Sequence, residues 1–217
     1  LSYIGRINYV LADKYLFTFN LRRDGSSRFS PDNKWGTFPS ASFGWRVSNE
    51  NFMAGIEAVS DLKLRSSWGQ VGFQEIGNYT FQTVLANTVN YVFGGQQVTG
   101  VAQRRLAASN LQWETSTQFD IGFDLGLFND QIYINADYYI KETENMLVPV
   151  PPSLSTGITN APTLNAGSVR NSGLEFALTY RKSSGAFQYD ISGNFATLNN
   201  EVLSLGGGQP IIGGNVN

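Results

Sequence analysis

The chain has 217 residues, 15 of them basic and 17 acidic, so its formal net charge is −2. It contains neither cysteine nor histidine, which excludes disulfides, thiol nucleophiles, thiolate or imidazole metal ligands and the commonest general base. The charges are scattered, so no basic surface predicts nucleic-acid binding, and no apolar run approaches the 18 residues of a transmembrane helix.

The N-terminal third predicts four β-strands, because apolar and polar residues alternate there with a period of two. The predicted strands are residues 2–11, 15–22, 35–48 and a run that begins at Leu62. The links between them are a tight turn at 12–14, a polar loop at 24–34 and a compact stretch at 49–61. In the compact stretch, Glu50 to Ala54 favours a helical turn.

The middle of the chain predicts a large loop, residues 72–110, followed by the longest hairpin. The loop has two β-like runs, 79–85 and 90–93, which predict an extra hairpin within it. In the longest hairpin, residues 119–125 and 132–140 alternate strictly on either side of an Asn129-Asp130 turn. Each arm exceeds ten residues, whereas strands of globular proteins usually have about five or six and a tilted transmembrane strand needs about 9–11.

The C-terminal part predicts two further strands after a loop. Residues 149–162 are rich in Pro, Ser and Thr and cannot join a strand ladder. The strands are residues 174–181 and 187–195, joined by a turn at 183–186. The chain therefore predicts about eight strands connected in series.

The links after the odd-numbered strands are short or compact, and those after the even-numbered strands are longer and polar. This is the plan of a transmembrane β-barrel, with short periplasmic turns and longer extracellular loops. Aromatic residues predicted near strand ends would form the interfacial girdle: Tyr15, Trp35, Tyr138, Tyr180 and Tyr189. A soluble β-sandwich or propeller shows the same alternation and remains an alternative, although strand length and the polar second face favour the barrel.

Several segments resemble the barrel signature of SusC/RagA-type TonB-dependent outer-membrane transporters of Bacteroidetes. In chain order they are Asp24-Gly-Ser-Ser-Arg-Phe29, Trp35-Gly-Thr-Phe-Pro-Ser-Ala-Ser-Phe-Gly-Trp-Arg46, Leu62-Lys-Leu-Arg-Ser-Ser-Trp-Gly-Gln-Val-Gly72, Leu111-Gln-Trp-Glu-Thr-Ser-Thr-Gln-Phe-Asp-Ile-Gly122, Ala136-Asp-Tyr-Tyr-Ile-Lys141, Asn171-Ser-Gly-Leu-Glu175 and Asn199-Asn-Glu-Val-Leu-Ser-Leu205. They cover nearly the whole chain, and together they are far more specific than any one of them alone.

The resemblance implies an all-β antiparallel barrel of 22 strands around an N-terminal plug, in the cell outer membrane. Residues 1–217 would form about eight strands of its wall, with the plug, the signal peptide and the closing strand outside this sequence. The implied partners are a SusD-like surface lipoprotein, TonB, the protein's own plug and outer-membrane lipid. The implied activity is TonB-driven import of oligosaccharides or, in some members, peptides, with no enzyme activity, cofactor or nucleic acid.

Two other functions remain open at this point. A secreted β-sandwich that binds carbohydrate would be a self-contained chain that needs no detergent. A passive porin would share the β pattern, but the resemblance disfavours it. The glutamates Glu75, Glu114, Glu142 and Glu144 are not spaced as a paired acid and base, so the sequence predicts no active site.

Two sets of candidate contact residues follow. Aromatic side chains in or beside the large loop are candidates for stacking on a sugar or contacting a lid: Tyr79, Phe81, Tyr91, Phe93 and Trp113. Self-packing of the loop is an alternative of at least equal weight for the first four, and packing or a girdle position is the favoured interpretation of Trp113. Basic residues on the polar face are expected to line the lumen and face the carboxylates of a plug: Arg6, Arg22, Arg46, Lys63 and Arg65.

Overall fold

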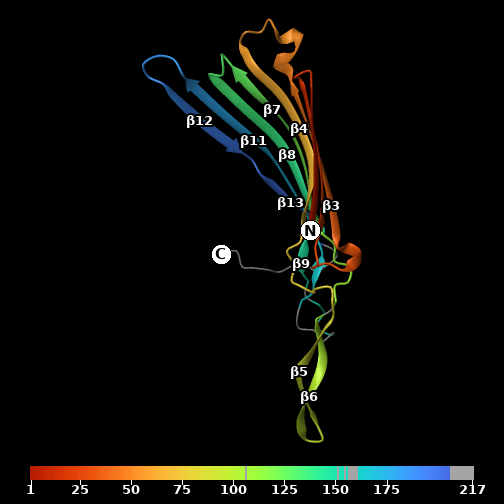
Figure 1. The fold of residues 1–217 in the computed structure, drawn as a ribbon. Coiled ribbons are helices and arrows are strands. Elements are labelled where there is room, and N and C mark those ends of the chain that lie inside the picture. The colour runs from red at the N-terminus through yellow and green to blue at the C-terminus, as the bar shows by residue number, and fades with distance from the viewer. Residues whose placement is uncertain (106, 151, 154, 156–160, 206–217) are drawn as a thin grey trace.

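The computed structural model describes residues 1–105, 107–150, 152–153, 155 and 161–205, and its main feature is one curved antiparallel sheet (Figure 1). The strands of this sheet are β1 (Ser2–Leu11), β2 (Tyr15–Gly25), β3 (Trp35–Arg46), β4 (Val59–Phe73), β7 (Glu114–Leu127), β8 (Ile132–Glu144), β11 (Ser168–Lys182), β12 (Tyr189–Ala196) and β13 (Asn199–Ser204). They lie in the order β1-β2-β3-β4-β7-β8-β11-β12, and β13 continues beside β11 beyond the end of β12. The eight predicted strands and their serial connection are therefore confirmed, although residues 47 and 48, predicted as the end of the third strand, lie in a 3-10 turn.

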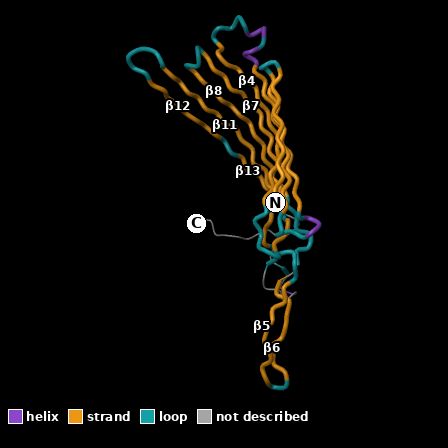
Figure 2. Tube along the Cα trace, viewed as in Figure 1, coloured by secondary structure: helices purple, strands orange, loops and turns teal. Residues whose placement is uncertain are grey.

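The remaining elements lie in the links (Figure 2). They are the 3-10 turns η1 (Pro31–Asn33), η2 (Val47–Asn49) and η3 (Asn51–Met53), the hairpin of β5 (Val84–Phe93) and β6 (Gln96–Arg105), and the short pair β9 (Leu147–Pro149) and β10 (Thr163–Asn165). The predicted helical turn near Glu50 is confirmed by η3. The prediction that residues 149–162 join no ladder was wrong at its first residue, because Pro149 pairs with Thr163 in the β9–β10 ladder. Other residues of this predicted loop (151, 154 and 156–160) lie outside the described residues.

The extra hairpin is confirmed, but its predicted arms were wrong. The runs 79–85 and 90–93 do not face each other; 84–93 is one continuous arm, and 96–105 is its partner. The turn between them uses Gly94 and Gly95, both at positive φ, where glycine carries no steric cost. The second arm escaped prediction because Gln96–Arg105 contains no aromatic residue and little apolar alternation.

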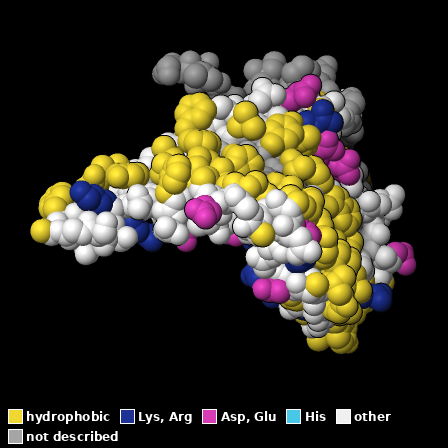
Figure 3. Space-filling view, turned by 90° about the horizontal axis from the view of Figure 1, so that it is seen from above, with side chains coloured by type: hydrophobic (Ala, Val, Ile, Leu, Met, Phe, Trp, Pro, Cys, Tyr) yellow, Lys and Arg dark blue, Asp and Glu magenta, His cyan; other side chains and the backbone are white. Residues whose placement is uncertain are grey.

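The sheet has one polar face and one apolar face, and the register keeps them separate across all its strands. Arg65 on β4 faces Gly122 on β7, which in turn faces Asp137 on β8. On the other face, Leu64 lies beside Phe123 and then Ala136. Seen from above, hydrophobic side chains gather along the convex side of the sheet (Figure 3). In the part of the chain that the structure describes, no second sheet covers this side, so the sandwich alternative does not fit.

Aromatic pairs mark both ends of the apolar face. Tyr15 and Trp45 stack at the short-turn end with ring centroids 6.3 Å apart, and Tyr3 and Trp35 stack at the long-loop end at 5.9 Å. Ten residue steps of β3 separate the two tryptophans, roughly 33 Å along the strand and about 25 Å after the usual tilt. That height matches the apolar band of a membrane barrel.

One girdle residue lies elsewhere than predicted, because Tyr138 is in the middle of β8 rather than at its end. No helix among the described residues is long and apolar enough to cross a membrane.

Candidate functional site

A network of charged side chains lies on the polar face where β4, β7 and β8 run side by side. Arg65 donates from Nε to Asp124 Oδ1 at 3.1 Å and from Nη2 to Asp137 Oδ2 at 2.7 Å. Lys63 approaches the other oxygen of Asp124 at 3.7 Å, and the Asn135 amide donates to Asp124 at 2.7 Å. One guanidinium thus bridges carboxylates from two strands, and it offsets the repulsion between them.

A groove of about 310 Å³ opens beside this network and is lined by Thr18, Ser42, Lys63, Arg65, Asp120 and Asp137 among others. Glycines let the long side chains lie flat across the strands: a Cβ on Gly122 would overlap the Asp137 carboxylate. Asp120 accepts hydrogen bonds from Ser67 at 3.0 Å and from Gln118 at 2.8 Å. The polar face therefore presents hydroxyls, amides and carboxylates along this groove.

The five predicted lumenal cations all lie on the polar face, and most have a carboxylate partner within the wall itself. Arg22 pairs with Asp24 at 2.6 Å and Arg46 with Asp13 at 2.6 Å, while Arg6 donates to the Asn20 side chain at 2.6 Å. Lys63 and Arg65 belong to the network just described. A carboxylate partner therefore already lies within reach of four of these cations, and contact with a plug stays a prediction.

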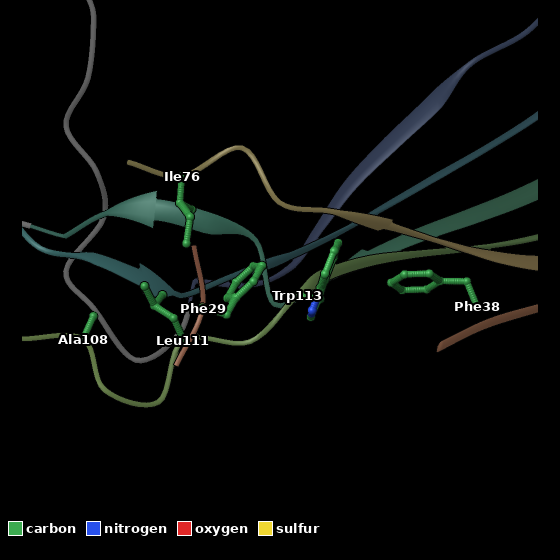
Figure 4. Close-up of a cluster of buried hydrophobic side chains, with 6 residues drawn as sticks. All are labelled: Phe29, Phe38, Ile76, Ala108, Leu111 and Trp113. Atoms are coloured by element: carbon green, nitrogen blue, oxygen red, sulfur yellow. The ribbon is translucent and has the colours of Figure 1, made fainter. Parts of the chain in front are cut away.

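A second cluster, which we call the rim cluster, closes the base of the long loops (Figure 4). Its buried members are Phe29, Phe38, Ile76, Ala108, Leu111 and Trp113. The Trp113 ring lies 5.0 Å from Phe29 and 5.5 Å from Phe38 between centroids, and its indole N–H donates to the carbonyl of Asn33 at 3.2 Å. The rim cluster thus ties the loop after β2 to both ends of the loop between β4 and β7.

Phe38 reaches the rim cluster because β3 and β4 separate near their long-loop ends. Their pairing stops at Ser40 and Gly69, and beyond it the Phe38 ring lies against Gly36 and Gly72, where any Cβ would overlap it. This role of Phe38 was not predicted from the sequence. The sequence did contain an indication, because Phe38 is an aromatic residue among alternate positions of its strand that are otherwise not apolar.

The predicted ligand or lid residues fall into two environments. Trp113 is buried in the rim cluster, as the packing interpretation expects. Tyr79 and Phe81 lie in the turn before β5, whereas Tyr91 and Phe93 share one face of β5 on the projecting hairpin and are exposed. For these four side chains, contact with a ligand or a lid remains a prediction.

A third cluster, at the short-turn rim, was not predicted. The Glu50 carboxylate accepts hydrogen bonds from Lys14 Nζ at 2.8 Å, the Tyr15 hydroxyl at 2.9 Å and the Trp45 indole at 3.1 Å. These donors hold the pKa of Glu50 below its ordinary value of 4.5, Lys14 having the largest effect. One carboxylate thus joins the link after β3 to the first turn.

Within the described residues, no group of three or more Asp and Glu side chains is arranged to hold a metal ion. The geometry is that of a sheet with a polar face and an apolar face. A family model described as "TonB dependent receptor-like, beta-barrel" matches residues 3–215. The chain belongs to this family of TonB-dependent receptor β-barrels.

Relatives of known identity agree with this assignment. The chain is 39% identical over 213 residues to the TonB-dependent receptor SusC of Bacteroides thetaiotaomicron and 37% identical over 212 residues to the TonB-dependent receptor P3 of Formosa agariphila. These alignments cover 96% and 97% of this chain but 21% of each relative, so the chain spans about a fifth of their length.

Solved structures give the same result. The RagAB peptide transporter superposes with a TM-score of 0.83 at 29% identity, covering 96% of this chain and 23% of that one. The RagAB peptide importer in its "open-open" state gives 0.82 at the same identity. The resemblance to SusC/RagA-type transporters is therefore confirmed.

Proposed function

We propose that residues 1–217 form about eight strands of the barrel wall of an outer-membrane transporter that imports oligosaccharides in a TonB-dependent manner. The observation that carries this proposal is the two-faced sheet, because its apolar face has the height of a bilayer and its other face is mainly polar and carries the charged network around Arg65. Such a wall places polar groups along a passage and apolar side chains against lipid. Membership of the TonB-dependent receptor family supports active import over a passive pore.

In this proposal the two faces have different tasks. The polar face, with the network around Arg65, borders the plug and the passage. The long loops, held at their base by the rim cluster, shape the substrate cavity at the outer surface, beneath a SusD-like lipoprotein lid. Energy reaches the plug from TonB, and the wall transfers no chemical group, so the protein acts as a transporter and not as an enzyme.

Peptides are the second candidate substrate, and one observation favours them: the matched solved structures are described as a peptide transporter and importer. The oligosaccharide proposal rests on the resemblance to SusC-type members. The exposed aromatic side chains of β5 suit either substrate, because an aromatic face stacks on a sugar ring and also packs against apolar peptide side chains.

The test is uptake by cells that carry the full-length receptor and its lipoprotein partner. Fluorescent oligosaccharides and fluorescent peptides are supplied separately to cells with and without a functional TonB system. We expect the oligosaccharide to enter only with TonB, and the receptor to be found in the detergent-extracted membrane fraction as a polypeptide several times larger than 23.9 kDa. Uptake without TonB would refute active transport, and TonB-dependent entry of peptide alone would favour the second candidate.

A further inference from the structure

The apolar face carries an arginine at the height where the bilayer should end. The outward residues of β2 are Tyr15, Phe17, Phe19, Leu21 and then Arg23, so that the cation follows directly on the apolar series at the long-loop end. Its neighbours across the sheet are Tyr3 on β1 and Thr37 on β3, both of this chain. Arg23 is exposed, and none of the described residues forms an ion pair with it.

A stacked pair of aromatic rings lies beside this arginine. Its guanidinium carbon lies 5.3 Å from the centre of the Trp35 ring, and Trp35 stacks on Tyr3. This cation–π contact places the guanidinium beside the ring, and no side-chain hydrogen bond of Arg23 occurs among the described residues, so its N–H groups remain available to a ligand. Those N–H groups form a planar fork that matches two oxygens of a phosphate.

The other basic residues at strand positions that belong to the apolar face provide a comparison. On the described wall strands these are Arg170 and Lys182. Arg170 also lies at the long-loop end, but Glu142 accepts from its guanidinium at 2.6 Å and Glu201 lies 3.8 Å away. Lys182 lies at the opposite, short-turn end of β11. Among the cations just named, Arg23 is therefore the one at the long-loop rim whose guanidinium N–H groups remain available to a ligand.

We propose that Arg23, Trp35 and Tyr3 bind the phosphate of an anionic lipid in the outer leaflet. The aromatic rings lie at headgroup depth, the acyl chains cover the apolar residues of β1 to β3, and the guanidinium edge binds the phosphate oxygens. Basic side chains at a membrane surface gain about a fivefold affinity each for anionic lipid. This inference rests on the membrane insertion proposed above.

The experiment uses the full-length receptor, purified in detergent and titrated with diphosphorylated lipid A or with the same lipid after removal of its phosphates. Binding is measured by native mass spectrometry. We expect Arg23→Gln to weaken binding of the phosphorylated lipid about fivefold, and the matched control Arg170→Gln to change it less than twofold. The dephosphorylated lipid should bind both variants and the wild type equally.

Three results would overturn the inference. One is equal binding of the phosphorylated and dephosphorylated lipids by the wild type, and another is an equal effect of the two arginine substitutions. The third is displacement of the lipid by millimolar inorganic phosphate, which would mean a site for the free ion.

If Arg23→Gln fails to insert, Arg23→Lys keeps the charge without the planar fork, and an unchanged affinity for the phosphorylated lipid would count against the bidentate contact. A receptor absent from the membrane would refute the proposed function itself, whereas a membrane-inserted receptor indifferent to phosphate would refute this inference alone.

Discussion

Replacing Trp113 by alanine should open the long loops while leaving the wall intact. The Trp113 side chain is 8% exposed, and its ring contacts Phe29 and Phe38 within the rim cluster. Truncating a buried aromatic residue costs about 3–5 kcal/mol, and we take about 3 kcal/mol because the rim cluster is small. The carbonyl of Asn33 would also lose its indole donor.

A loss of about 3 kcal/mol corresponds to roughly a hundredfold increase in the population of the locally open state. Hydrogen exchange of the full-length receptor, read by mass spectrometry, measures this directly. Amides of residues 26–34 should exchange about a hundredfold faster, while those of β7 and β8 should not change. Phe93→Ala is the matched control, because that side chain is 73% exposed on the projecting hairpin. Unchanged exchange at 26–34, or an equal rise in the wall strands, would contradict the argument.

Three further predictions concern the wall and its rims. Arg65→Met should lower the stability of the folded receptor by about 1–2 kcal/mol in urea unfolding, since it leaves Asp137 without its cation and Asp124 with Lys63 alone. The usual cost of about 3–5 kcal/mol is reduced because Arg65 is partly exposed and Lys63 remains beside Asp124. Gly72→Ala should destabilise the receptor in the same assay, because the added Cβ would overlap the Phe38 ring. Adding Phe38→Ala should restore part of this lost stability, since the overlapping ring is then gone. Two purely additive losses of stability would contradict this explanation. Glu50 has a pKa below its ordinary value, so its contribution to stability is complete above pH 4.5 and falls as pH decreases through the lowered value. Unfolding measured between pH 3 and pH 7 should therefore depend less on pH in Glu50→Gln, and an unchanged dependence would refute the role assigned to this carboxylate.

The wall could be predicted from the sequence because each strand encodes both faces locally. The alternation along 119–125 and 132–140 identifies β7 and β8 without knowledge of their neighbours, and the parity of link lengths then fixes the two rims. The same local rule placed all five basic residues on the polar face. It did not give their partners, since the bond from Arg65 to Asp137 joins residues 72 positions apart.

The rims were harder to predict, because their contacts are not periodic. Glu50 meets Lys14 and Tyr15 across 36 and 35 residues, and no pattern in either segment indicates the pairing. Phe38 has the parity of a lumenal residue, yet its environment depends on where β3 and β4 separate, which is a property of the twisted sheet. The second arm of the loop hairpin lacked the aromatic residues that identified the first.

The rim cluster also bears on how such receptors diversify. The chain enters and leaves the segment between Ile76 and Ala108 at residues packed within the same cluster, so the ends of this segment are held together whatever lies between them. Because the entropy of closing a loop grows only slowly with its length, insertions or exchanges there should cost the wall little. Grafting the corresponding segment of another family member between these two anchors is therefore a direct route to receptors with altered outer surfaces on an unchanged barrel.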